Sequence, residues 1–534
     1  MNLESHRFDA PSTRTISQHD PATLESLGSV SAMSEEEVRD RVRRGREAQH
    51  AWARTSFRER RQVLQAILDH IVAHQEEICR AAVRDSGKTM VDAALGEIFP
   101  VCEKIRYVID HGEADLAPET RRSGFLAHKR ARVEYHPLGV VGVICPWNFP
   151  FHNIFCPVVP ALFAGNAVVA KVSEWSSSSA AGYLEIVHDA LRRFGHSTDL
   201  VQILTGYGET GAALVRSGVE TVFFTGSPEN GRRVMATASE SLTPVVLELG
   251  GKDAMVICDD ANIDHAVDQA LLGVYTACGQ MCVGAERIYV FDAVYDEFVR
   301  RVHERVRAFR QGPPLEKLVD VGAMTMPRQI EIVLELVADA KAKGARVLIG
   351  GKRNPRYDGQ FVEPTILVDV DHTMRITQEE QFGPVMVVVR VRDEEEAVRL
   401  ANDCPYGLGS SVFTRDAVRG RRIANQLRAG MTVVNDYGLA YMIQSLPFGG
   451  VGRSGFGRIN GREGLRACCY TKAHVEDRIP MGRGVGVYPV HPETFDLVRQ
   501  VVQIIYGSGL GTRLRGIVGA AESFVSIARA RLRS

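Results

Sequence analysis

Three short segments carry side chains that could take part in covalent chemistry. Cys282 ends the glycine-containing segment GQMC, and a cysteine thiolate is a strong nucleophile. Glu248 lies in PVVLELGGK, an otherwise apolar run in which a buried carboxylate needs a reason. Asn148 lies in CPWNFP, between two aromatic residues and two prolines that suit a firmly held hydrogen-bond donor. Together they could supply a nucleophile, a base and an oxyanion donor.

Each of these residues also has a purely structural explanation. Cysteine is among the most often buried residue types, so Cys282 could be a small core side chain. Glu248 could form an ion pair with Lys252, and Asn148 could cap a tight loop. The occurrence of all three in one chain favours the chemical interpretation over the structural one.

Two glycine-rich segments could hold a phosphate group. Residues 206–211, GYGETG, fit the dinucleotide pattern G-x-G-x-x-G between an apparent strand and helix. The acidic residue expected at the end of the next strand is missing, because that strand ends in FTGS. Gly226 and Ser227, followed by Gly231, open a predicted helix whose free N–H groups could face a pyrophosphate. A glycine-rich turn without a ligand is the alternative there.

The N-terminal part is predicted to be a mobile arm over residues 1–30, followed by helices over 34–118. Ser34 and Glu37 have the spacing of a capping box, and an apolar set at helical spacing follows near residues 63–72. Within this region GKT, at 87–89, suggests a P-loop, but the first glycine of that motif would be residue 82, which is alanine. We reject that interpretation.

From about residue 133 the pattern changes to short β-branched runs separated by helical segments. This alternation predicts βαβ units, in which helices cover a parallel sheet. A second series runs from RIYVF at 287–291 to MTVVN at 431–435. Two α/β domains in tandem are therefore expected.

The C-terminal segment is predicted to form an amphipathic helical extension. Its apolar positions share one face, while arginines such as Arg513, Arg515 and Arg529 lie on the opposite face. Such a helix could lie on a membrane surface or a partner protein. The alternative is a terminal helix that packs against its own or a sister subunit.

Composition limits the classes of function. With 534 residues, 45% of them apolar, two or three globular domains are expected. The formal net charge of -1 provides no overall field that would attract nucleic acid. We expect a cytoplasmic protein, because no secretory pattern or run of ~20 apolar residues is present. The ten cysteines lack paired metal-ligand spacing, so no metal site is predicted.

Seven motifs resemble those of the aldehyde dehydrogenase superfamily, in the same order and at similar spacing over roughly residues 30–475. They are CPWNFP, KVSE, FTGSPENG, LELGGK, GQMC, EEQFGP and PFGGVGRSGFG. The stretch GAERIYV and the long tail are most similar to the plant family-22 members. The resemblance implies an α/β fold with a Rossmann-type NAD-binding domain, an α/β catalytic domain and a small β oligomerisation element. The expected boundaries are 31–118 and 139–247, then 248–455, then 119–138 with 456–475, and an extension over 476–534.

The resemblance also implies residue roles. Cys282 matches the nucleophile that forms a thiohemiacetal with the aldehyde, and Asn148 matches an oxyanion donor. Glu248 matches the base that activates water to hydrolyse the thioester, so the product is a free carboxylic acid. Members that transfer the acyl group to coenzyme A lack this glutamate.

Cofactor contacts are implied in the same way. Lys171 and Glu174 match the residues at the adenosine ribose, and a carboxylate there would repel a 2′-phosphate, so NAD is expected rather than NADP. The remaining matches are Trp147, Gly208, Gly226, Ser227, Gly231, Leu249, Gly250, Glu380 and Phe382. The expected function is oxidation of a small-molecule aldehyde by a homodimer or homotetramer, with a candidate peripheral membrane contact through the tail. The alternatives are an NADP-dependent semialdehyde dehydrogenase and a catalytically silent membrane-associated scaffold.

Overall fold

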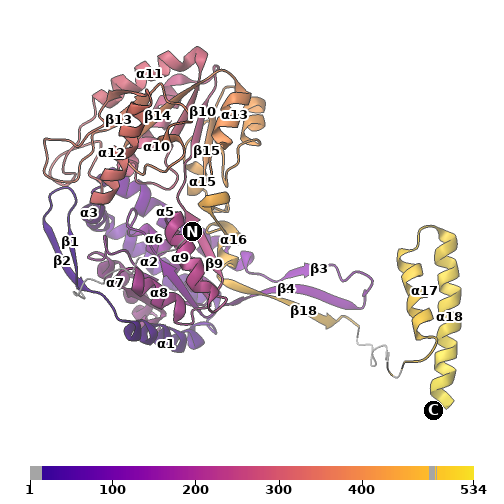
Figure 1. Cartoon of the computed structure of the whole chain (residues 1–534). Helices are drawn as coiled ribbons and strands as arrows, with labels where there is room; N and C mark the ends of the chain where they lie inside the picture. Colours follow the sequence, from indigo (N-terminus) through magenta and orange to yellow (C-terminus); the bar gives the residue numbers. More distant parts are fainter. Residues whose placement is uncertain (1–14, 480–487, 489, 534) are drawn as a thin grey trace, which may run out of the picture. The chain divides into compact units, whose positions relative to one another are not determined.

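The structure is a computed structural model that describes residues 15–479, 488 and 490–533 (Figure 1). The chain divides into two compact units, the smaller of which comprises Ala117–Tyr135 and Thr471–Ser534. Residues 456–470, expected in the oligomerisation element, belong instead to the larger unit. The reason is that α16 (Gly461–Arg466) packs against α5 and α6 there.

Helices fill the region from residue 35 to residue 115, as the sequence predicts. Ser34 and Glu37 form the expected capping box at the start of the first helix, and Ser56 and Glu59 form a second. The helices are α1 (Glu35–Trp52), α2 (Phe57–Ala73), α3 (Gln75–Ser86), α4 (Met90–Ala93) and α5 (Phe99–Asp115). A π-helical turn, Ala94–Ile98, separates α4 from α5.

Residues 15–31 differ from the mobile arm that the sequence suggested. They form an antiparallel hairpin of β1 (Thr15–His19) and β2 (Ser26–Ser31). Ile16 and Gln18 are buried, and the Gln18 side-chain amide donates a hydrogen bond to the carbonyl of Glu174 at 2.9 Å. Contacts of this kind order a terminal segment. The polar composition of residues 15–31 does not reveal them. Residues 1–14 lie outside the described residues.

The first of two large sheets has the doubly wound topology of a nucleotide-binding fold. Its strand order is β17-β9-β8-β5-β6-β7, and all neighbours are parallel except β17 with β9. The strands are β5 (Val140–Ile144), β6 (Ala167–Lys171), β7 (Val201–Leu204), β8 (Thr221–Gly226), β9 (Val245–Leu249) and β17 (Gly455–Phe456). The associated helices are α6 (His152–Ala164), α7 (Ala180–Arg193), α8 (Gly208–Arg216) and α9 (Pro228–Ser239). The strand order reverses between β5 and β8, so the loops that follow these two strands border a crevice.

The second large sheet has the order β12-β13-β14-β11-β10-β15-β16 and is parallel except for β12. Its strands are β10 (Ala254–Ile257), β11 (Arg287–Phe291), β12 (Arg346–Ile349), β13 (Thr365–Val368), β14 (Val385–Val391), β15 (Ser410–Phe413) and β16 (Val433–Val434). The helices of this part are α10 (Ile263–Tyr275), α11 (Asp292–Arg307), α12 (Pro327–Ala342), α13 (Glu394–Asn402), α14 (Ala417–Ala424) and α15 (Leu439–Met442). Two tandem α/β domains are thus confirmed.

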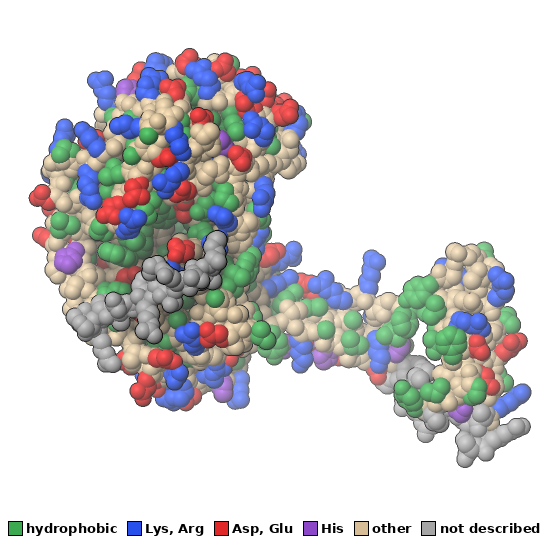
Figure 2. Space-filling view, in the orientation of Figure 1, with side chains coloured by type: hydrophobic (Ala, Val, Ile, Leu, Met, Phe, Trp, Pro, Cys, Tyr) green, Lys and Arg blue, Asp and Glu red, His purple; other side chains and the backbone are tan. Residues whose placement is uncertain are grey.

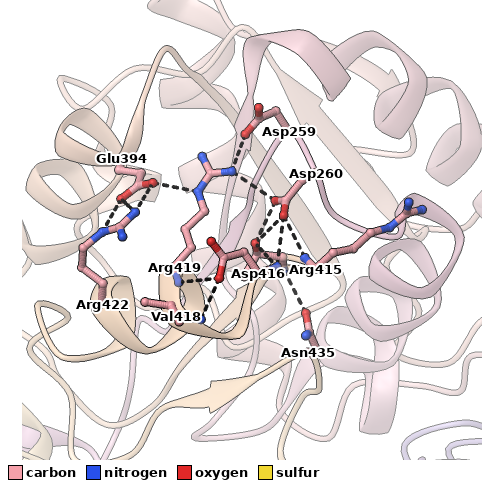
Figure 3. A network of polar contacts seen from close by, with 10 residues as sticks. Asp259, Asp260, Glu394, Arg415, Asp416, Val418, Arg419, Arg422 and Asn435 are labelled. Carbon is pink, nitrogen blue, oxygen red and sulfur yellow. Dashed lines mark hydrogen bonds and ion pairs between the residues drawn. The ribbon is translucent and has the colours of Figure 1, made fainter.

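A network of charged side chains joins the ends of β10 and β15 to α13 and α14 (Figure 3). Arg419 donates to Asp259, Asp260 and Glu394 at 2.7, 3.1 and 2.7 Å. Asp416 caps α14 by accepting two backbone N–H bonds. This network fixes two surface helices to the sheet.

The segment that precedes Cys282 has an unusual backbone. Ala277, Cys278 and Gly279 adopt left-handed conformations, with φ of 51°, 57° and 73°. A Cβ on Gly279 would lie 2.2 Å from the carbonyl oxygen of Gly383, so only glycine fits there. Non-glycine residues with positive φ are costly and occur most often at functional sites. Sterics therefore explain why residue 279, the first of GQMC, is a glycine.

The smaller unit contains most of a three-stranded sheet, in which β3 and β4 are antiparallel, and a pair of helices. The sheet has the order β18-β4-β3, with β3 (Glu119–Arg121), β4 (Lys129–Pro137) and β18 (Cys469–Asp477). The helices α17 (Thr494–Tyr506) and α18 (Leu510–Arg533) pack against each other. They carry exposed apolar side chains (Figure 2), namely Phe495, Val498, Val502, Leu514, Ile517, Val518 and Phe524. Among the described helices, none combines the length and apolar character needed to span a bilayer.

Candidate active site

A cavity of about 1080 Å³ lies in the larger unit, and residues of both α/β domains line it. Cys282, Glu248 and Asn148 all line this cavity, although they lie far apart in the sequence. Pockets of this size are typical of small-molecule and cofactor sites. The three segments singled out from the sequence therefore meet at one place.

Glu248 lies beside the thiol of Cys282. Each side chain affects the pKa of the other, and Cys282 is only partly buried because it faces the cavity. The ion pair of Glu248 with Lys252, considered from the sequence, does not form, because Lys252 pairs with Glu286 at 2.9 Å. The second carboxylate oxygen of Glu248, Oε1, is buried without a hydrogen-bond partner among the described residues. It is available to a water molecule or a substrate.

Burial changes the proton affinity of both groups. Burial raises the pKa of Glu248 to about 7, although the nearby Cys282 thiol opposes this rise. Burial and the nearby carboxylate of Glu248 raise the pKa of the Cys282 thiol well above its ordinary value. At neutral pH the thiol is therefore protonated, and Glu248 is poised to exchange a proton.

Asn148 lies in the loop between β5 and α6, and a buried ion pair holds this loop from behind. Lys88 and Glu97 are both fully buried and form a salt bridge. The Lys88 ammonium also donates to the carbonyl of Asn148 at 2.7 Å, and Glu97 accepts the backbone N–H of His152 at 2.8 Å. The pair thereby fixes the backbone at Asn148 and at His152, two residues after PWNFP.

The same pair explains the π-helical turn that carries Glu97. Lys88 Nζ lies 3.9 Å from the ring centroid of Phe149, a cation–π contact that adds to the ion pair. Wide π turns are rare and occur mainly at functional sites. Here the turn Ala94–Ile98 presents Glu97 to the loop.

The predicted adenosine and pyrophosphate residues lie together in the cavity wall. Lys171, at the end of β6, contacts Glu174 at 3.3 Å, and both residues line the cavity. Gly226 and Ser227 lie at the start of α9, where Ser227 is the N-cap residue. A helix N-terminus with a glycine before it is a ready site for a phosphate group. This arrangement fits a dinucleotide.

Two of the predicted cofactor residues do not line the cavity. Gly208 begins α8, outside the cavity wall. Gly231 lies inside α9, where a Cβ would come within 2.8 Å of the Leu249 side chain. Gly231 therefore allows α9 to approach β9 closely, and the predicted cofactor contacts of Gly208 and Gly231 stay predictions.

The predicted nicotinamide residues lie together near Cys282. The rings of Trp147 and Phe382 make an edge-to-face contact, with centroids 5.6 Å apart. Glu380 accepts a hydrogen bond from the N–H of Gly251 at 3.0 Å, and it lines the cavity together with Leu249 and Gly250. Phe382 has a φ of 46°, a strained conformation held by a hydrogen bond from its N–H to Glu286 at 2.9 Å.

Sequence reasoning missed several residues of the site. Lys88 was noticed only as part of a rejected P-loop, and Glu97 was not noticed at all. His152, Asn153 and Tyr441 also line the cavity. The one signal that the sequence offered was Lys88, a lysine within a region predicted to be helical and buried. Nothing local in the sequence marks Tyr441. Among the described residues, no group of three potential metal ligands comes together.

The larger unit combines a doubly wound sheet with a large cavity, and in that cavity a thiol lies beside a carboxylate whose pKa is raised. These features are typical of oxidoreductases that use a cysteine. Comparison with known proteins gives the family. The model of the aldehyde dehydrogenase family matches residues 8–474. The chain belongs to the aldehyde dehydrogenase family, and the expected fold class is confirmed.

Individual relatives agree with this assignment. An aldehyde dehydrogenase-like protein of Schizosaccharomyces pombe is 38% identical over 505 residues, covering 92% of this chain and 97% of the relative. The glutarate-semialdehyde dehydrogenase of Pseudomonas putida is 35% identical over 463 residues, covering 86% of this chain and 93% of the relative. The betaine aldehyde dehydrogenase of Staphylococcus aureus in complex with NAD+ superposes with a TM-score of 0.83 at 31% identity, covering 89% and 93% of the two chains.

Replacing Lys88 by Met should destabilise the protein strongly. It leaves Glu97 buried without a cation, which typically costs about 3–5 kcal/mol. The matched variant Lys88→Met with Glu97→Gln removes both charges and should recover part of this loss. Denaturant midpoints of the three proteins measure the effect. Equal midpoints for Lys88→Met and the wild type would show that the pair does not stabilise the fold.

Proposed function

We propose that the protein oxidises an aldehyde to the carboxylic acid with NAD, through a covalent intermediate on Cys282. The observation that carries the proposal is that Cys282, Glu248 and Asn148 line one cavity, where the carboxylate of Glu248 lies close enough to the thiol to affect its pKa. Lys171, Glu174, Gly226, Ser227, Glu380 and Phe382 would hold the cofactor. When bound, NAD supplies the acceptor for the hydride that leaves the aldehyde carbon.

The first half of the reaction forms the bond to sulfur. Glu248 takes the thiol proton, and the Cys282 thiolate attacks the aldehyde carbon to give a thiohemiacetal. The side-chain amide of Asn148 and the backbone N–H of Cys282 donate to the oxygen that becomes negative, and losing one such donor typically costs ~10²–10³ in rate. Loss of the hydride leaves a thioester on Cys282.

The second half releases the acid. Glu248 first releases the thiol proton to solvent. Its carboxylate, with Oε1 unpartnered, then accepts a proton from water, and the resulting hydroxide attacks the thioester carbon. The carbon–sulfur bond breaks, the carboxylic acid leaves, and Cys282 regains a proton. One aldehyde, one water and one NAD+ give one acid, one NADH and one proton.

Two alternatives have specific consequences. An NADP-dependent semialdehyde dehydrogenase would need a 2′-phosphate to fit beside Glu174. A catalytically silent scaffold has no need to keep Cys282, Glu248 and Asn148 in one cavity, which argues against it. The relation to the plant family-22 members stays a prediction.

Self-association is proposed through the smaller unit. β3 and β18 are the edge strands of its three-stranded sheet, and edge strands offer backbone groups for pairing with another chain. A homodimer or homotetramer could use them. The peripheral membrane contact also stays a prediction, since the exposed apolar side chains of α17 and α18 would suit a lipid surface or a sister subunit equally.

The function is tested by NADH formation with NAD and a series of aldehydes from short to long chain. We expect turnover by the wild type and a loss of at least ~10³-fold for Cys282→Ala, because no other group can form the thioester. NAD binding by Cys282→Ala, measured by calorimetry, controls for folding. Absence of turnover with every aldehyde, although NAD binds, would favour the silent scaffold.

The rate of turnover should depend on the ionisation of Glu248. Because burial raises its pKa from the ordinary value of 4.5 to about 7, the carboxylate is mostly protonated at pH 6 and becomes an active base as the pH rises through 7. The steady-state kcat should therefore increase with an inflection near pH 7. Glu248→Gln should lower kcat by ~10²–10⁴ and remove the inflection. An inflection that persists in Glu248→Gln would assign the titration to another group.

The choice of cofactor should depend on Glu174. Replacing it by Gln removes the negative charge beside the expected 2′-position, so we expect kcat/KM with NADP to rise by about 10-fold relative to NAD. Glu229→Gln is the matched control, because Glu229 is another carboxylate of the cavity wall. A wild type that prefers NADP would contradict the proposed cofactor directly.

A further inference from the structure

A chain of polar side chains connects Asn148 to the far wall of the cavity. It comprises Asn153 and His152, at the start of α6, and Tyr441, in α15. All three residues line the cavity, and the function proposed above gives none of them a role.

The amide of Asn148 is held on both sides. Its Nδ2 donates to the carbonyl of Gln280 at 3.0 Å, and its Oδ1 accepts a hydrogen bond from Asn153 Nδ2 at 3.1 Å. A flipped amide would place Oδ1 against a carbonyl oxygen and Nδ2 against another NH2 group, which are two repulsive contacts. The flip state of Asn148 is thereby fixed, and one N–H of Nδ2 is left for a substrate oxygen.

The chain continues beyond Asn153. Asn153 Oδ1 can only accept, so His152 Nδ1, at 3.3 Å, must carry the proton of that hydrogen bond. Burial lowers the pKa of His152 to about 4, so the ring is neutral at physiological pH and its Nε2 is an acceptor. Tyr441 therefore donates its O–H to Nε2. Each donor points toward the next residue, from Tyr441 through His152 and Asn153 to Asn148 and Gln280.

Tyr441 itself is held by packing. Its ring makes an edge-to-face contact with Phe448, with centroids 4.6 Å apart, and its hydroxyl lies 3.7 Å from the sulfur of Cys156. The chain is therefore complete only when the segment around α15 packs against α6. The position of α15, which carries Tyr441, therefore affects the orientation of Asn148.

We propose that Asn153, His152 and Tyr441 are positioning residues that orient the amide of Asn148 toward the substrate oxygen. The inference rests on the proposed role of Asn148 as an oxyanion donor. It predicts that these residues affect the chemical step and that they do so through Asn148 alone.

The test compares Asn153→Asp and Asn153→Leu with the wild type. Asn153→Asp keeps the shape but replaces the donor by an oxygen that repels Asn148 Oδ1, and Asn153→Leu removes the hydrogen bond without adding charge. Both variants should lower kcat/KM for the aldehyde by ~10-fold or more, because a displaced group can cost up to ~10² in rate. The dissociation constant for NAD should stay unchanged. Wild-type kcat/KM in both variants would overturn the proposal.

A double-mutant cycle with Asn148→Ala separates this proposal from the proposed function. Asn148→Ala alone should lower kcat/KM by ~10²–10³. Adding Asn153→Asp to it should cause no further loss, because the positioning residue then has nothing to position. Additive losses would overturn the positioning role and leave the oxyanion role intact. Full activity of Asn148→Ala would instead refute the oxyanion role.

Tyr441→Phe provides a milder variant in case the Asn153 substitutions do not fold. It removes only the terminal donor and should lower kcat/KM by about 3-fold, the effect of one ordinary hydrogen bond. In the Asn148→Ala background this effect should also vanish. A Tyr441→Phe loss of the same size in both backgrounds would show that Tyr441 contacts the substrate independently.

Discussion

The buried ion pair of Lys88 and Glu97 is the interaction on which the site depends most. Two charges without solvent are stable only when each has further partners. Lys88 finds them in the carbonyl of Asn148 and the ring of Phe149, and Glu97 in the backbone N–H of His152. The groups that satisfy the pair belong to the loop after β5 and to the start of α6, so the same pair stabilises the fold and holds the loop that carries Asn148.

A second buried pair performs the same task on the opposite wall. Lys252 pairs with Glu286, and Glu286 accepts the N–H groups of Gln381 and Phe382 at 3.1 and 2.9 Å. These hydrogen bonds hold Phe382 in its strained conformation against Trp147. Each domain thus uses one buried Lys–Glu pair to hold one wall of the cavity, and Cys282 lies where the two walls meet. Side chains fixed in this way need little reorganisation when charge develops.

The sequence predicted the features that depend on local pattern or on complete motifs. The capping box at Ser34 and the two parallel sheets follow from periodicity, and the resemblance led to Cys282, Glu248 and Asn148 in one cavity. Features that depend on distant partners were not predictable. Gln18 orders the N-terminal hairpin through a bond to residue 174, and Tyr441 reaches His152 across 289 residues of chain. Gly231 shows a requirement that its motif did not reveal, since a Cβ at this position would lie 2.8 Å from the side chain of Leu249.

The distribution of negative charge explains why one carboxylate can serve both halves of the proposed reaction. Glu248, Asp253 and Glu380 all raise the pKa of the Cys282 thiol, so the nucleophile is protonated until a base removes its proton. Burial raises the pKa of Asp253 to about 8, and it also raises the pKa of Glu380. Glu248, with a pKa of about 7, is the carboxylate with the largest effect on the thiol. Its proximity to the thiol and a pKa near neutrality suit it first to ionise the thiol and then to activate water.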